Sequence, residues 1–149
     1  MSDTLLPIVA EIGIDAPIAH VWEVLTSEAT VPDWLGCIGY RREVGTTFFM
    51  QQDAALRAKG DPTGATHCDV VLLEAPHKFN FTWYVPGTPK TLVQISLFSE
   101  GPSRTFVRLL HDGWAQFPPE MVKPFHDQLK SGWSGGVLPG LKRLAETTR

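Results

Sequence analysis

The sequence has little charge, and neither sign dominates. Charged residues make up 19% of the chain, and the formal net charge is -3. There is no run of lysine and arginine that would attract nucleic acid or an anionic membrane. There is also no apolar run long enough to span a bilayer, and no basic-then-apolar signal peptide. We therefore expect a cytoplasmic protein with no membrane span and no nucleic-acid partner.

Cysteine is also scarce. The chain has two, Cys37 and Cys68, and they do not form a closely spaced pair. Without an export signal, we expect reduced, buried thiols rather than a disulfide. The histidines, His67 and His126 among them, lack the spacing of a metal-binding motif. The sequence therefore predicts no metal and no cofactor.

Catalytic signatures are missing as well. There is no Gly-x-Ser-x-Gly turn, because Ser134 follows Trp133 within a helical pattern. The expected apolar faces carry no paired carboxylates, and the segment "GDPTG" lacks the lysine of a phosphate loop. We therefore favour a protein that is not an enzyme, with His111 as the one weak candidate for an acid or base.

The hydrophobic content of 43% is that of an ordinary globular protein, and residues 1–149 fit a single domain. The clearest pattern is in residues 121–149, where apolar residues recur in steps of three or four, as on one face of an amphipathic helix. Glycines from Gly132 to Gly140 weaken this helix, and Pro139 is expected to bend it by clashing with the carbonyl of Gly135.

The rest of the chain is dominated by strand patterns. Residues 8–14 alternate between apolar and polar, and two short helices are expected at 17–27 and 29–35. Five further strands follow, with residues 53–65 as a loop. Short turns between consecutive strands predict an antiparallel, six-stranded sheet whose apolar face is covered by the C-terminal helix, which is an α+β fold.

Four segments carry a resemblance to a known family: "APIAHVWEVLTSEATVPDW" (16–34), "EAPHKFNFTW" (74–83), "TFVRLLHDGW" (105–114) and "SGWSGGVLPGLKRL" (131–144). In this order they resemble the activator-of-Hsp90-ATPase-homologue branch of the START-like (SRPBCC, Bet v 1-like) superfamily. The resemblance covers almost the whole chain. It implies a helix-grip fold, in which the sheet wraps around the last helix and a cavity lies between them.

A cavity is also favoured by the residues themselves, because the apolar sheet face and helix face oppose each other and the glycines near Trp133 leave space between them. Solid packing of the same side chains is the alternative. The candidate ligand-binding residues are Trp34, Phe48, Met50, Phe81, Trp83, Val107, His111, Phe125, Leu129 and Trp133.

Two of these candidates have open alternatives. His111 shares its strand face with Val107 and Leu109, so it could orient a ligand or act as an acid or base. The alternative is a histidine near the strand end that is hydrogen-bonded to the backbone or exposed. Trp34 either lines the pocket mouth or anchors a short helix to the core.

Three functions follow. The first is binding of a small hydrophobic or amphipathic molecule without catalysis. The second, which the resemblance implies, is a protein-interaction module for a chaperone ATPase, although the family's co-chaperones carry a separate N-terminal domain, which we do not expect here. The third is a cyclase or hydrolase that uses His111. A homodimer is compatible with each of them.

Overall fold

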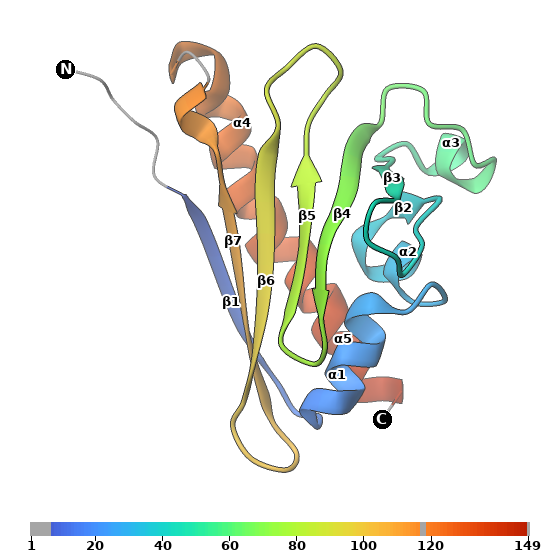
Figure 1. The fold of residues 1–149 in the computed structure, drawn as a ribbon, viewed down its shortest axis with the longest axis vertical. Coiled ribbons are helices and arrows are strands. Elements are labelled where there is room, and N and C mark those ends of the chain that lie inside the picture. The colour runs from blue at the N-terminus through green and yellow to red at the C-terminus, as the bar shows by residue number, and fades with distance from the viewer. Residues whose placement is uncertain (1–6, 117–118, 149) are drawn as a thin grey trace.

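The computed structural model describes residues 7–116 and 119–148, without the side chains of residues 119–122 and 125. Figure 1 shows a twisted antiparallel sheet with a long C-terminal helix lying across one face. In chain order the elements are β1 (Ile8–Ile14), α1 (Ile18–Thr26), α2 (Val31–Leu35), β2 (Cys37–Ile38), β3 (Thr47–Met50), α3 (Ala54–Ala58), β4 (Thr66–Glu74), β5 (Lys78–Trp83), β6 (Thr91–Ser99), β7 (Thr105–Asp112), η1 (Trp114–Gln116), α4 (Pro119–Gly132), η2 (Trp133–Val137) and α5 (Leu138–Thr148).

The sheet order is β1-β7-β6-β5-β4-β3-β2, and every neighbouring pair is antiparallel. From β3 onward the chain forms a meander, as the short turns predicted. β1 completes the far edge by pairing with β7, with Ile8 opposite His111 and Ile14 opposite Thr105. The two short helices after β1 are confirmed, and α1 and α2 both contact α5.

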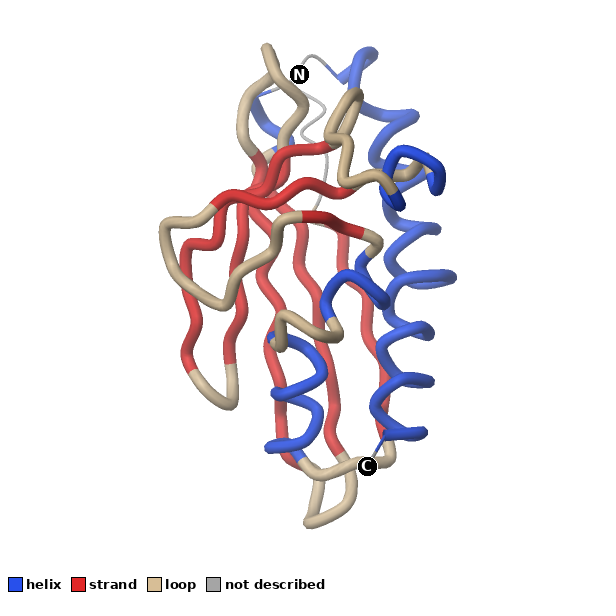
Figure 2. Tube along the Cα trace, turned by 90° about the vertical axis from the view of Figure 1, so that its right-hand side faces the viewer, coloured by secondary structure: helices blue, strands red, loops and turns tan. Residues whose placement is uncertain are grey.

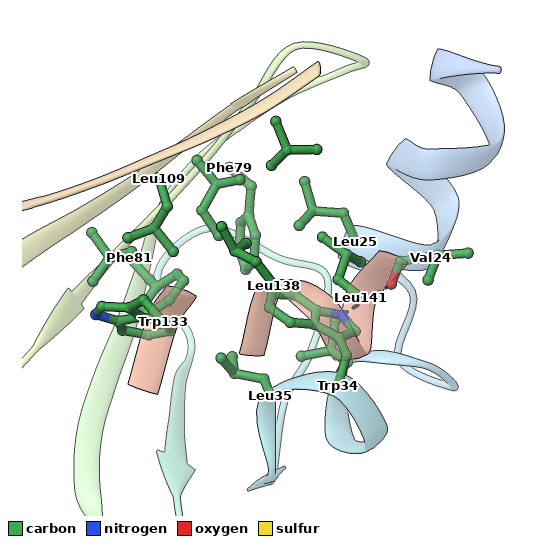
Figure 3. Packing of buried hydrophobic residues seen from close by; sticks show 14 of the residues in the cluster. Val24, Leu25, Trp34, Leu35, Phe79, Phe81, Leu109, Trp133, Leu138 and Leu141 are labelled. Carbon is green, nitrogen blue, oxygen red and sulfur yellow. Dashed lines mark hydrogen bonds between the residues drawn. The ribbon is translucent and has the colours of Figure 1, made fainter. Parts of the chain in front are cut away.

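The inner face of the sheet and the long helix form the core. Phe79, Phe81 and Leu109 from the sheet and Trp133, Leu138 and Leu141 from the helix are almost completely buried. Figure 3 shows these side chains directed toward one another, with Trp34 and Leu35 of α2 beside them. The alternating pattern of the strands therefore places their apolar side chains on the sheet face that packs against the helix, as expected.

The long helix differs from the prediction at its middle. Residues Trp133–Val137 form one turn of π-helix, in which the N–H of Leu138 donates to the carbonyl of Trp133. Pro139, which has no N–H to donate, is the second residue after this wider turn. The sequence predicted a bend at Pro139 but not this wider turn, which accommodates the proline, and the helix continues as α5. Figure 2 shows it running the length of the sheet.

Two further expectations are corrected. The sheet has seven strands rather than six, because Cys37 and Ile38 pair with Met50 and Phe49 at the edge. A strand of two residues is too short to show alternation. The expected loop at 53–65 also contains α3, whose first N–H groups are capped by Asp53: the carboxylate accepts from the amides of residues 55 and 56 at 2.9 and 3.0 Å.

Candidate functional site

A cavity of about 380 Å³, here called the main cavity, lies between the ends of β3, β4 and β5 and the middle of the long helix. Four of the predicted ligand-binding residues are in its wall: Met50, Trp83, Leu129 and Trp133. Sequence reasoning did not select the other lining residues, which are Gln52, Gly64, Thr66, Val85, Gln128, Gly132 and Val137. Val137 belongs to the predicted apolar face of the helix, but several of the others lie in turns or at helix positions between the apolar ones, where no periodic pattern points to them.

The remaining predicted residues are placed elsewhere. Phe48, Phe81 and Val107 are completely buried in the core and do not line the main cavity. The side chain of Phe125 lies outside the described part of the structure. Their spacing identified the inner face correctly, but position on that face does not distinguish packed residues from those that border a space.

Trp34 borders a different space. A second cavity of about 440 Å³, here called the helical cavity, lies between α2 and α5 and is lined by Asp33, Trp34, Gly136, Gly140, Arg143, Leu144 and Thr147. The indole N–H of Trp34 donates to the carbonyl of Val24 at 3.1 Å. Trp34 therefore anchors α2 to α1, and one side of its ring borders the helical cavity.

His111 forms the centre of a buried hydrogen-bond chain directly behind the main cavity. The indole N–H of Trp133 donates to His111 Nδ1 at 3.2 Å. The proton of the imidazole is therefore on Nε2, which donates to Thr91 Oγ1 at 2.7 Å. The Thr91 hydroxyl in turn donates to the carbonyl of Trp83 at 2.6 Å. Every polar group in this chain has a partner, as buried polar groups require.

The hydrogen-bond chain around His111 fixes two side chains that line the main cavity, Trp133 and Trp83. Trp133 is held through its N–H, and the ring of Trp83 contacts the imidazole at a centroid distance of 5.4 Å. His111 itself is fully buried. Burial, with a smaller contribution from His126, lowers the pKa of His111 to about 3. His111 is therefore neutral at pH 7, and both of its ring nitrogens are occupied.

The glycines of the long helix are also placed differently from expectation. Gly132, Gly135 and Gly136 are exposed, and a Cβ built on any of them meets nothing within 4 Å. They do not open space inside the core. Gly132 borders the main cavity, Gly136 borders the helical cavity, and Gly135 borders neither.

Comparison with known proteins agrees with this architecture. Residues 15–144 match the family described as activator of Hsp90 ATPase homolog 1-like protein. The chain belongs to this family. The resemblance seen in the four sequence segments is thus confirmed. No curated protein matches the chain in sequence.

Several solved structures share this fold. A protein from Mesorhizobium loti has a TM-score of 0.78 at 22% identity, covering 97% of this chain and 99% of that one. An Aha1 dimer from Colwellia psychrerythraea has a TM-score of 0.71 at 20% identity, with coverage of 95% and 97%. An HSP90 activator from Plasmodium falciparum has a TM-score of 0.67 at 16% identity, with coverage of 92% and 95%. These likenesses establish the helix-grip fold.

The described residues were also compared with the requirements of metal, disulfide and membrane-spanning sites. Among the described residues, no group of three or more His, Cys, Asp or Glu side chains is arranged to hold a metal ion. Cys37 and Cys68 are both buried and form no disulfide. Burial raises the pKa of the Cys37 thiol to about 12 and that of the Cys68 thiol well above its usual value. Within residues 7–116 and 119–148, no helix is long and apolar enough to cross a membrane.

Proposed function

We propose that this protein binds a small hydrophobic or amphipathic molecule in the main cavity, without catalysis. The observation that supports this most directly is the cavity itself, about 380 Å³ with Met50, Trp83, Leu129 and Trp133 in its wall. A concave, mostly apolar space with a few polar groups is the usual form of a small-molecule site. Burying ~200 Å² of apolar ligand surface at ~25 cal/mol/Å² gives about 5 kcal/mol before entropic costs.

The test compares two glycines of the same helix. Gly132→Leu places a side chain at the main cavity, and Gly135→Leu places the same side chain where it borders neither cavity. Titration with the neutral dye Nile red should show binding to the wild type and to Gly135→Leu, and weakened binding to Gly132→Leu. Native mass spectrometry of freshly purified protein, followed by denaturing extraction, would identify a molecule that co-purifies. Equal dye binding by both variants would contradict the proposal.

A second candidate function is interaction with a chaperone ATPase. Its support is the family and the fold shared with the proteins called an HSP90 activator and an Aha1 dimer. Among the exposed large apolar residues, Val9, Val71 and Phe98 lie on three different strands and do not line the main cavity, whereas Val85 does. Stimulation of Hsp90 ATP hydrolysis by the purified chain would favour this function. Sedimentation at several concentrations would test the homodimer.

The enzymatic alternative has less support. His111 would have to exchange a proton with a substrate, yet both ring nitrogens are engaged within the protein and its pKa is about 3. We also place the protein in the cytoplasm, since two buried free thiols suit a reducing compartment.

A further inference from the structure

The wall of the main cavity has polar side chains but no charged ones. Gln52, Thr66 and Gln128 contribute the polar groups, and none of the described lining residues is Asp, Glu, Lys, Arg or His. Gln52 and Gln128 are exposed, and Thr66 is half-buried. The polar groups therefore lie at the mouth, while Met50 and Trp133 are buried deeper in the wall.

These three polar side chains are not used within the protein. In the described part of the chain, neither the two amides nor the Thr66 hydroxyl forms a side-chain hydrogen bond to another residue. Other polar side chains nearby do: Gln51 Nε2, next to Gln52, donates to the carbonyls of Asp61 and Thr63 at 2.9 and 2.8 Å. The mouth therefore keeps both donors and acceptors available for a ligand.

We propose that the main cavity selects uncharged ligands whose polar group both donates and accepts hydrogen bonds. Each glutamine amide offers an N–H and a carbonyl oxygen, which a carboxamide or hydroxyl group satisfies together. A carboxylate can only accept, so it uses the amide N–H groups and leaves the amide oxygens without a donor from the ligand. It also gives up part of its hydration at a mouth whose lining supplies no cation. This proposal rests on the proposed binding function and specifies its ligand class.

Three probes of similar size distinguish the proposed selectivity from the proposed binding function: cinnamamide, cinnamate and allylbenzene. Binding of each probe is followed by the chemical shifts of the tryptophan indole N–H groups. In the wild type at neutral pH, cinnamamide should bind about tenfold more tightly than cinnamate. Binding of cinnamate as tight as that of cinnamamide would overturn the proposed selectivity, while the binding function would stand. If none of the three probes shifts the indole signals, the binding function itself fails, and the selectivity with it.

Substitutions at one mouth residue then test the cause. Gln128→Leu should weaken cinnamamide about threefold to tenfold and leave allylbenzene unchanged, because it removes one amide and keeps the apolar wall. Gln128→Lys should shift the preference toward cinnamate, because it supplies the missing cation. Gln94, on the outer face of the sheet in register with Leu110 and Asn80, gives matched controls. Gln94→Leu and Gln94→Lys should leave the preference unchanged, and an equal effect at the two positions would overturn the proposal.

Discussion

The buried histidine should make the stability of this protein depend on pH in a defined window. The pKa of His111 is about 3 in the folded chain and 6.5 for an ordinary histidine. Between these values the unfolded chain holds a proton that the folded chain does not, so acidification favours unfolding. The stabilisation by the neutral, buried His111 is therefore complete above pH 6.5 and is lost progressively as the pH falls toward 3.

The expected size follows from the width of this window. One pKa unit corresponds to ~1.4 kcal/mol, so lowering the pH from about 7 to about 4 should remove about 3 kcal/mol of unfolding free energy through His111 alone. Urea unfolding followed by tryptophan fluorescence at several pH values in this range measures the loss directly.

Two variants isolate the cause. His111→Gln keeps a hydrogen-bonding side chain but does not titrate, so it should be less stable at pH 7 and lose about 3 kcal/mol less than the wild type on acidification. Thr91→Val removes the partner of Nε2 and keeps the histidine, so it should be destabilised but retain the slope with pH. If the wild type and His111→Gln lose the same free energy between pH 7 and pH 4, His111 is not the neutral buried group described above.

Three other measurements test the packing. Trp133→Phe should lower the unfolding free energy by about 1–3 kcal/mol in urea titrations, because it leaves Nδ1 of His111 buried without a donor; an unchanged midpoint would contradict the hydrogen-bond chain. Gly135→Ala should raise stability by about 0.5–1 kcal/mol, since its Cβ meets open space. Gly113→Ala should lower stability, since φ is +106° and the Cβ would lie 3.1 Å from a backbone atom. Thermal melts in which Gly135→Ala and Gly113→Ala change the melting temperature in the same direction would refute these two predictions. Cys68 should resist thiol reagents in the native state at neutral pH and react once the protein is unfolded in urea, because burial raises its pKa; rapid labelling of the native protein would show that it is accessible.

The fold could be predicted from the sequence largely because its strands are regular. Alternation in residues 8–14 gave the bounds of β1 as the structure has them, and the parity of His111 with Leu109 placed it on the inner face. The helix was harder, because a strict step of three or four residues continues the apolar face from Trp133 to Val137. In the structure the next fully buried residue is Leu138, five positions on, because the π-turn inserts one residue into the repeat.

The site was less predictable for a related reason. Periodicity identifies which side chains face inward, but whether Phe81 packs or Trp83 borders a space depends on how far the helix lies from each strand end. The distance between the helix and each strand end is set by the packing of the whole domain. The polar mouth residues Gln52, Thr66 and Gln128 carried no local signal, since a glutamine or threonine at a strand or helix surface is ordinary.

The π-turn at Trp133–Val137 also separates two parts of the long helix that have different neighbours. Residues after it, such as Leu141 and Ala145, belong to the core, while residues before it, such as Gln128 and Leu129, line the main cavity. The π-turn uses one residue more than an α-turn for about the same rotation, so Leu138 follows Trp133 on the buried face although it is five positions on. Deleting Gly135 should therefore leave both segments facing as they do now, but lower the unfolding free energy, because Pro139 would then lie within an unbroken α-helix. A Gly135 deletion that keeps its preferred probe and unfolds at a lower urea concentration would show that the extra residue accommodates the proline.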